Sequence, residues 1–317
     1  MARQYLDFEK PILELAARID DMRAAHEEGE ITAEKNMPAE IERLEVRLAR
    51  VTRLLYRHLT PHQKVMVARH PQRPQGSDYI NTLVTDFVAL EGDRRFGSDK
   101  ALVGGVGKLG GLPCMILCND KGKDTQGRLA RNFGMPKPEG YRKAQRLMLM
   151  ADRLGLPVVS FVDTPGAFPG IDAEERGQAE AIATCLEVQL SLKVPFVSVI
   201  TGEGGSGGAL AMAVADKVLM LENSVYSVIS PEGCAAILWK EANKDTIPLA
   251  AEALKMTAND LMELKIIDEV IKEPVGGAHA DPELAMRRVG AAVLAHLGGL
   301  KGKDCKELRR ERFLKMT

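Results

Sequence analysis

The feature that most constrains the fold of this chain is a repeat with an offset of thirty-eight residues. Segment 154–166 aligns with segment 192–204, and leucine, proline, valine, serine and glycine fall in register between the two copies. Each copy has the length and β-branched content of a buried strand, ends in a glycine-bearing turn, and is preceded by a helical stretch. Strands joined through helices pair in parallel, so we expect both turns to open at the same edge of one sheet.

The turn of the second copy, residues 201–208 (TGEGGSGG), leads into a helix of small residues at 209–215. The first amide groups of a helix have no partner inside the helix and carry the positive end of its dipole, so they stabilise an approaching anion. Glycine has no Cβ and lets a ligand come close to the backbone. The turn therefore predicts an oxyanion site made of main-chain N–H groups.

Two common motifs also match this turn, although each is weak in a segment so rich in glycine. The pattern G-x-G-x-x-G at 202–207, followed by Glu222, is typical of a dinucleotide site and would make the chain an NAD-dependent dehydrogenase. The pattern G-x-S-x-G at 204–208 has the form of a nucleophile elbow and would make it a hydrolase. A third alternative is a non-catalytic assembly subunit that only binds partners through its N-terminal helices.

Composition excludes several classes of protein. The chain has 317 residues, 45% of them hydrophobic, and a formal net charge of −1, which suits one large or two ordinary globular domains. This balance gives no reason to expect nucleic acid or a membrane as a partner, and residues 1–7 lack a signal-peptide core, so we expect a cytoplasmic protein. Five cysteines are scattered without a C-x-x-C pair, and we therefore expect no metal held by this chain alone.

The rest of the pattern predicts a helical hairpin followed by strands and helices. Two helical stretches with one apolar seam each are expected between Pro11 and Arg57, separated by a polar break at 27–36. The Pro-punctuated segment 69–77 indicates a domain boundary, and the basic stretch 121–143 is either a solvated face or a docking surface for an acidic or phosphate-bearing partner. Further expected elements are a helix at 79–90, paired strands at 101–107 and 112–118, a third strand-turn-helix unit at 218–239, a helix at 249–264, a strand at 266–271, a helix at 282–297 and a solvated or mobile tail at 301–315.

Five strings in the chain closely resemble the carboxyltransferase alpha subunits of bacterial acetyl-CoA carboxylase. The similarity runs along essentially the whole chain, and only the tail and the break at 27–36 look idiosyncratic. Several of the strings are specific to that family. They are RHPQRP at 69–74, RNFGMP at 131–136, DTPGAFPG at 163–170, GEGGSGGAL at 202–210 and SPEGC at 230–234.

This resemblance implies a fold and a division into domains. The fold is α/β and crotonase-like (the ClpP/crotonase type), a superhelix of β-β-α repeats with an N-terminal helical hairpin, which agrees with the repeat described above. The implied domains are a helical hairpin and connection at 1–75, a crotonase-like carboxyltransferase domain at 76–300 and a charged C-terminal tail at 301–317.

The resemblance also implies a reaction and its partners. Members of the family transfer a carboxyl group from carboxybiotin, presented by a separate biotin carboxyl carrier protein, to acetyl-CoA and form malonyl-CoA, the first committed step of fatty acid synthesis. ATP is used by another component, biotin carboxylase. A beta subunit with a zinc ribbon completes the enzyme as an α2β2 tetramer, and the absence of paired cysteines here agrees with an alpha subunit.

The implied chemistry needs no side-chain nucleophile. Loss of CO2 from carboxybiotin leaves negative charge on the ureido group, and removal of a proton from the acetyl methyl group leaves an enolate oxygen. Preformed N–H donors stabilise both anions, so geometry is expected to be the main catalytic contribution. By the resemblance, the site consists of Gly207 and Gly208 as main-chain oxyanion donors to carboxybiotin, Gly204, Gly205 and Ser206 around this cofactor, and Gly166 and Ala167 as a second donor pair.

Overall fold

The structure is a computed structural model that describes residues 4–27 and 37–316, so most of the polar break expected at 27–36 lies outside the described residues. The helices are α1 Lys10–Glu27, α2 Met37–Arg57, α3 Pro61–Ala68, α4 Gly76–Leu83, α5 Thr125–Ala130, α6 Pro138–Leu154, α7 Ile171–Glu175, α8 Gln178–Ser191, α9 Ser206–Ala213, α10 Pro231–Leu238, α11 Thr246–Ala253, α12 Ala258–Glu263, α13 Pro282–Leu300 and α14 Cys305–Leu314. The strands are β1 Val84–Ala89, β2 Leu102–Leu109, β3 Leu112–Asn119, β4 Val158–Thr164, β5 Phe196–Gly205, β6 Lys217–Leu221, β7 Val225–Ser227 and β8 Glu269–Ile271.

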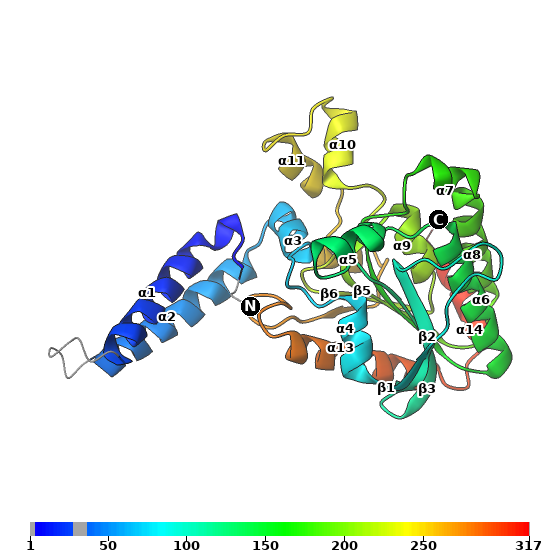
Figure 1. The fold of residues 1–317 in the computed structure, drawn as a ribbon, viewed down its shortest axis with the longest axis horizontal. Coiled ribbons are helices and arrows are strands. Elements are labelled where there is room, and N and C mark those ends of the chain that lie inside the picture. The colour runs from blue at the N-terminus through cyan, green and yellow to red at the C-terminus, as the bar shows by residue number, and fades with distance from the viewer. Residues whose placement is uncertain (1–3, 28–36, 317) are drawn as a thin grey trace.

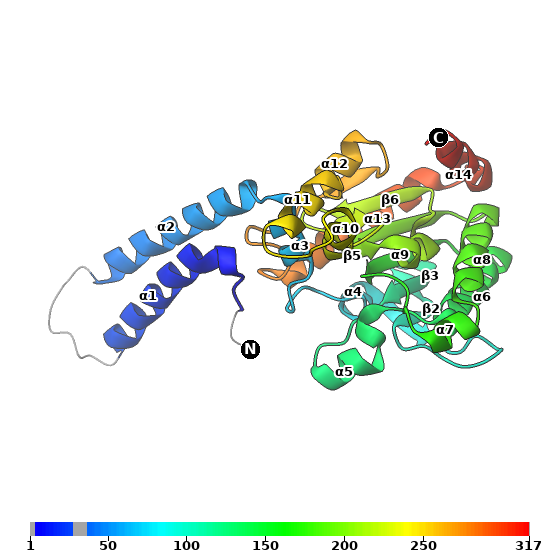
Figure 2. The ribbon, with the colours of Figure 1, turned by 90° about the horizontal axis from the view of Figure 1, so that it is seen from above.

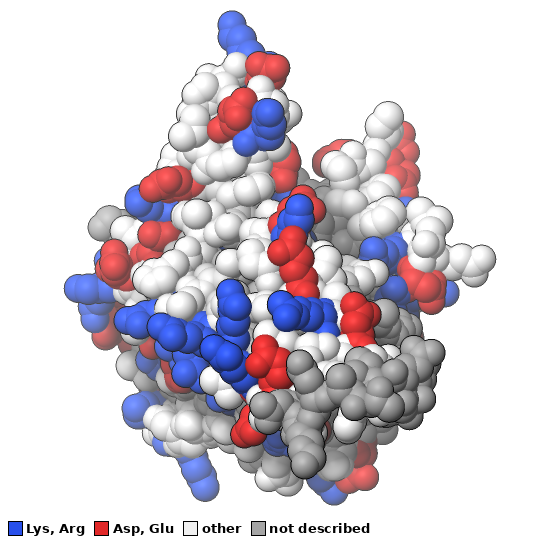
Figure 3. Space-filling view, turned by 90° about the vertical axis from the view of Figure 1, so that its left-hand side faces the viewer, with Lys and Arg blue, Asp and Glu red and all other residues white. Residues whose placement is uncertain are grey.

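Helices α1 and α2 form the predicted N-terminal hairpin, which projects away from the body of the molecule in both ribbon views (Figure 1, Figure 2). The sides that the periodicity marks as apolar face inward, with Ile12, Ile19 and Leu44 at most 4% exposed and the other seam residues half-buried. Arg23 and Glu45 form an ion pair between the two arms. Lys and Arg side chains gather in a band on the side of the molecule from which the hairpin extends (Figure 3).

Within the described residues, eight strands form one mixed sheet in the order β1-β2-β3-β4-β5-β6-β8, with β7 paired to β5. The first three strands pair antiparallel, and the pairs from β3 onward are parallel. The two copies of the repeat form the neighbouring strands β4 and β5, in which Val158 lies beside Phe196 and Ser160 beside Ser198. The hydroxyl oxygens of these two serines, 38 residues apart in the chain, are 2.8 Å apart in space. The predicted parallel register is confirmed.

Strand β5 is longer than its sequence pattern predicts. We expected it to end near Ile200, but it continues through the first glycines to Gly205. Its first half pairs with β6, and its residues 203–205 pair with β7. Extended glycines suit this stretch because neighbouring atoms approach too closely for a Cβ. The glycine run is therefore part strand and part turn.

Helices cover both faces of the sheet. One apolar core lies on the side of α6, α8 and α9 and includes Leu147, Phe196 and Met212, while the other lies on the side of α4 and α13 and includes Tyr79 and Phe161. Strands β4 and β5 are buried along almost their whole length, as parallel strands covered on both faces should be. Among the described helices, none combines the length and apolarity needed to cross a bilayer.

Two predictions of local structure were wrong. The helix expected at 79–90 ends at Leu83, and the β-branched stretch that follows forms the edge strand β1. The helix expected at 249–264 is divided at Thr257, whose side chain accepts the N–H of Asp260 and begins α12. The tail is a mostly exposed helix, as predicted, but Arg309 of α14 is fully buried and lies 2.6 Å from Asp216.

Candidate active site

The second glycine turn places the start of helix α9 at the carboxyl end of β5. Helix α9 begins at Ser206 directly after the strand, and Gly205 at the N-cap makes no side-chain bond to its amides. The first N–H groups of α9 therefore have neither an intrahelical partner nor a side-chain cap, and they carry the positive end of the helix dipole. Ser206 is exposed, Gly207 is half-buried and Gly208 is buried. This end of the helix can receive an anion.

Close packing requires four of the five glycines in this turn. An added Cβ would sit closer to a neighbouring atom than real Cβ atoms do. Gly207 differs from the others, because its added Cβ would only reach ordinary contact with Ile182 Cγ2 at 3.4 Å. Packing therefore explains four glycines but not Gly207, the residue expected to face the substrate. The nearest distances at the other four are 2.3 Å at Gly202, 2.8 Å at Gly204, 2.1 Å at Gly205 and 2.6 Å at Gly208.

The first turn, at the end of β4, lies against the second. Thr164 is paired with Gly204 in the sheet, and a Cβ on Gly208 would lie 2.6 Å from Gly166 C and 2.8 Å from Ala167 N. The prediction that both turns open at the same sheet edge is confirmed. Gly166 N–H donates to Thr164 Oγ1 at 3.1 Å, so this amide has a partner inside its own turn. Of the expected second donor pair, Ala167 is the stronger candidate.

The residues of the two alternative motifs, the nucleophile elbow and the dinucleotide site, do not have the surroundings that a hydrolase or a dehydrogenase requires. Ser206 has a φ of +49°, as a nucleophile elbow would, but the hydrogen bonds found among the described residues include none to its hydroxyl group. Glu222, the expected ribose ligand of a dehydrogenase, is paired with Lys272 at 2.7 Å. Gly202 and Gly204 lie inside β5 rather than in a loop.

An apolar cavity of about 340 Å³ opens beside Gly207. Ser206 and Gly207, at the start of α9, form one edge of it, so the open amides and the apolar wall belong to the same cavity. A flat ring system with one polar edge matches this combination. The apolar wall is formed by Leu210, Tyr226, Val228, Leu254, Leu261 and Ile266.

A chain of ion pairs lies at the ends of the two strands that carry the turns. Lys121 Nζ is 2.7 Å from Asp163 Oδ1 on β4 and 2.9 Å from Glu203 Oε2 on β5. Arg69 Nε is 2.6 Å from Glu203 Oε1, and Arg69 Nη1 is 2.6 Å from Glu232 Oε1 on α10. Negative and positive groups alternate along this series of ion pairs, so each group stabilises its neighbours.

The side chains in this series of ion pairs remain charged at neutral pH. Burial alone would raise the pKa of Glu203, but the charges of Lys121 and Arg69 outweigh it and hold that pKa at about 2. Burial would lower the pKa of Lys121, but Asp163 and Glu203 raise it above its ordinary value. Sequence reasoning placed Lys121 in a basic stretch at 121–143 that was either solvated or a docking surface, whereas its side chain is only 18% exposed. The ion pairs around Lys121 were not predicted from the sequence.

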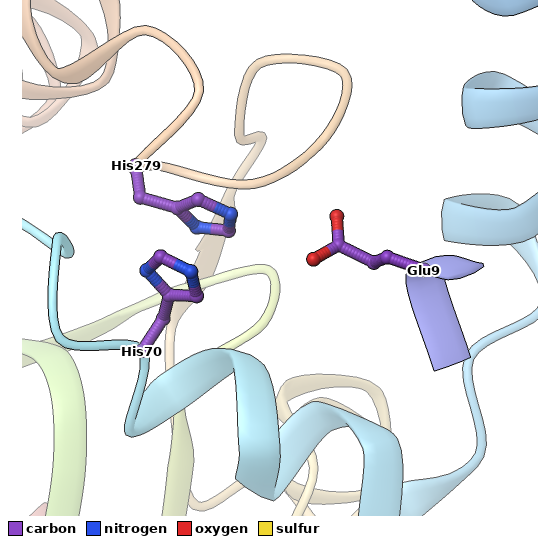
Figure 4. Close-up of side chains that lie close together, drawn as sticks. All are labelled: Glu9, His70 and His279. Carbon is purple, nitrogen blue, oxygen red and sulfur yellow. The ribbon is translucent and has the colours of Figure 1, made fainter. Parts of the chain in front are cut away.

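Glu9, His70 and His279 come together near the base of the hairpin (Figure 4), and their possible ligand atoms lie within 4.8 Å of one another. His70 Nδ1 accepts the N–H of Gln72 at 3.1 Å, which leaves the ring proton on Nε2, 3.1 Å from Gln4 O. The rings of His70 and His279 are stacked with centroids 3.7 Å apart. Both ring nitrogens of His70 are thus engaged, which favours a hydrogen-bonded junction over a metal site. That the chain holds no metal stays a prediction.

A family model and two curated relatives identify the proteins that this chain resembles in sequence. A family model described as "Acetyl co-enzyme A carboxylase carboxyltransferase-like" matches residues 5–317. Over 313 residues the chain is 54% identical to the acetyl-coenzyme A carboxylase carboxyl transferase subunit alpha of Zymomonas mobilis, with 98% of each chain covered. It is 52% identical to the protein of the same name from Paraburkholderia phymatum, with 99% of this chain and 95% of the relative covered.

Solved structures with a similar fold include a transcarboxylase and a subunit of an acyl-CoA carboxylase. Transcarboxylase 12S matches with a TM-score of 0.56 and 21% identity over 70% of this chain and 41% of that chain. The beta subunit of P. aeruginosa geranyl-CoA carboxylase matches with a TM-score of 0.55 and 17% identity over 78% of this chain and 46% of that chain. Likeness at this identity shows the fold alone, and it confirms the predicted crotonase-like α/β fold. The relatives support the carboxyltransferase interpretation and not the dehydrogenase. The chain therefore belongs to the acetyl-CoA carboxylase carboxyltransferase family.

Proposed function

We propose that this chain is the alpha subunit of an enzyme that moves a carboxyl group from carboxybiotin to acetyl-CoA and forms malonyl-CoA, the first committed step of fatty acid synthesis. The observation that carries the proposal is the uncapped start of α9 beside an apolar cavity. The full-length relatives, named carboxyl transferase subunit alpha, support the same conclusion.

The residues present fit biotin. A cavity of about 340 Å³ lies at the lower end of the range for small-molecule sites, and its wall is mostly apolar. Ser206 and Gly207 bring a polar main-chain edge to one side of it, with Gly204 and Gly205 before them at the end of β5. Carboxybiotin supplies an activated carboxyl group, and the cavity holds its ring while the amides face its carbonyl oxygen.

In this proposal the main-chain N–H groups of Gly207 and Gly208 stabilise the negative charge that develops on that oxygen. They are oriented by the helix before the substrate arrives, so no reorganisation is needed during the reaction. Ala167 N–H acts from the neighbouring turn, whereas Gly166 N–H is engaged by Thr164. Fixed dipoles, rather than a titrating side chain, provide the catalysis.

An exposed apolar lobe next to the cavity is evidence that a partner protein docks there. Helices α10 and α11 stand out from the body of the molecule (Figure 1). In and beside them, Val228 is 75% exposed, Ile237 69%, Leu238 63% and Leu249 54%, and large exposed apolar groups that lie together mark an interface. We propose that this lobe binds the beta subunit of an α2β2 tetramer. Zinc is expected on that subunit and no metal on this one.

Other components complete the proposed reaction. A biotin carboxyl carrier protein presents the carboxybiotin, and a separate biotin carboxylase uses ATP to form it. Neither nucleic acid nor a membrane is a proposed partner, and the proposed location is the cytoplasm. The lack of a helix able to cross a membrane among the described residues is compatible with that location.

The substitution Gly207→Val tests the proposal. A branched side chain at the edge of the cavity obstructs approach to the amides, so we expect turnover to fall by about a hundredfold or more, the usual effect of losing one oxyanion donor. The assay is malonyl-CoA decarboxylation with free biotin by the chain mixed with its beta partner. Gly299→Val is the matched control, because a Cβ there meets nothing within 4 Å. Wild-type turnover in a folded Gly207→Val enzyme would rule out this site.

A further inference from the structure

Lys121 lies between the ends of β4 and β5, the two strands that carry the glycine turns. Its ammonium group contacts Asp163 Oδ1 at 2.7 Å and Glu203 Oε2 at 2.9 Å. Asp163 Oδ1 also accepts the backbone N–H of Glu203 at 2.8 Å. One carboxylate thus joins the two strand ends directly, and the lysine joins them a second time through charge. Both contacts lie within a few residues of the amides of Gly166 and Gly207.

The Lys121 side chain is held in place from its other side. Gly134, with a φ of +81°, packs so closely that a Cβ there would lie 2.5 Å from Lys121 Cγ and 3.3 Å from Asp163 O. Gly134 belongs to the string RNFGMP at 131–136. Only glycine satisfies both the backbone conformation and this contact. Gly134 of this string therefore fixes the position of the lysine side chain.

Further charged residues extend the ion pairs of Lys121 toward α10. Arg69 bridges Glu203 to Glu232 on α10, which continues the alternation of sign outward from the strand ends. A small cavity of about 220 Å³ adjoins the group. The charged or titratable residues that line it are Arg69, His70, Arg73, Lys121, Arg128, Asp163 and Glu203.

We propose that Lys121 is a positioning residue for carboxyl transfer, which fixes the separation of the two turns by holding Asp163 and Glu203 together. It acts through the backbone and does not touch the substrate. The inference rests on the proposed oxyanion role of Gly207 and Gly208. Without the lysine, two carboxylates face each other at the strand ends, and their repulsion displaces one turn against the other. A displacement of about 1 Å is enough to lower turnover by about a hundredfold.

Three variants of the chain, each assayed as the complex with the beta partner, test this role. We expect Lys121→Met to lower kcat for malonyl-CoA decarboxylation with free biotin by about a hundredfold and to leave KM for malonyl-CoA within a few-fold. Lys121→Arg keeps the charge and should recover most of kcat. Lys123→Met is the matched control, because Lys123 is exposed and pairs with Asp78 on α4 rather than with the strand ends, and it should behave as wild type. A Lys121→Met kcat within threefold of wild type would overturn the proposal.

The pH profile separates positioning from a general loss of structure. In Lys121→Met, Glu203 loses a counter-charge and its pKa rises, so protonation at lower pH relieves the repulsion between the carboxylates. The ratio of variant to wild-type kcat should therefore increase from pH 8 to pH 6. A ratio that does not change with pH would contradict the proposal. If Lys121→Met does not fold, Asp163→Asn tests the same contact with almost the same shape, and an unchanged kcat there would overturn the inference.

Failure of this inference can be told from failure of the proposed function. If Gly207→Val loses turnover while Lys121→Met and Asp163→Asn retain it, the oxyanion site stands and only the positioning role is refuted. If Gly207→Val also retains turnover, the proposed function of the turn itself has failed.

Discussion

The turns at the ends of β4 and β5 arise from the same repeat, but they leave their amides in different states. In the first turn, Thr164 Oγ1 accepts Gly166 N–H at 3.1 Å and donates to Gly166 O at 2.8 Å, so the turn closes on itself. In the second, Gly205 has no side chain to do this, and the chain passes directly into α9. Topology brings the two turns together, while one side chain decides whether an amide stays open to a ligand.

The two turns pack closely at Gly208. We expect Gly208→Ala to lower the free energy of unfolding by about 3 kcal/mol, because its Cβ would meet the backbone of Gly166 at 2.6 Å. Turnover should fall at least a hundredfold as the amide is displaced. Gly207→Ala is the control. It should change stability by no more than about 1 kcal/mol, because its Cβ meets only Ile182 at 3.4 Å. Denaturant unfolding gives the stability of both variants, and kcat gives their turnover. A similar loss of stability in the two would contradict the difference in packing between Gly208 and Gly207.

The closed state of the first turn depends on Thr164. We expect Thr164→Val, which keeps the shape of the side chain, to cost about 1–3 kcal/mol of unfolding free energy, because Gly166 N–H is left buried without an acceptor. The kcat of the folded fraction should change less than tenfold. Thr164→Ser restores the hydroxyl group and should restore most of the stability. A loss of kcat as large as that of Gly207→Val would mean that the first turn acts on the substrate as directly as the second.

The smallest expected effect is the pH dependence of the second turn. Because Glu203 has a pKa of about 2 in the folded chain and an ordinary value of 4.5, its contribution to stability is complete above pH 4.5. It is lost as the pH falls from 4.5 toward 2. We expect no change from this group between pH 6 and pH 9. Unfolding free energies measured against pH for wild type and Glu203→Gln check this, and an equal acid dependence in both would contradict the assignment.

Much of the fold could be predicted because local patterns and tertiary structure agree. The repeat specified the β4–β5 register, and the apolar seams specified the hairpin. Strand β1 was missed because its alternation is short and follows a helix without a break at Leu83. The end of β5 was misplaced because glycine has low strand propensity, while the close packing of Asp163, Tyr226 and Pro165 against these glycines, which comes from other segments, favours the extended form.

The candidate site was predictable to the extent that it consists of backbone. A strand, a glycine run and a helix are local features, and they predicted a main-chain oxyanion site in this turn, whereas the choice of Gly207 and Gly208 came from the family resemblance. The ion pairs of Lys121 could not be found this way, because Arg69, Asp163 and Glu203 come from separate segments of the chain. A lysine directly after a buried strand was the one local sign that its charge needed a partner.

The buried guanidinium of Arg309 has a consequence for β5. It donates to the carbonyl groups of Gln189, Leu192 and Val194 and to Asp216, which itself accepts the N–H of Phe196 at 2.7 Å. The strand is thus anchored by an ionic group at its beginning as well as at its glycine-rich end. A substitution in α14 that removes these hydrogen bonds should therefore also shift the glycine-rich end of β5. Such a substitution would lower turnover although it lies far from the substrate.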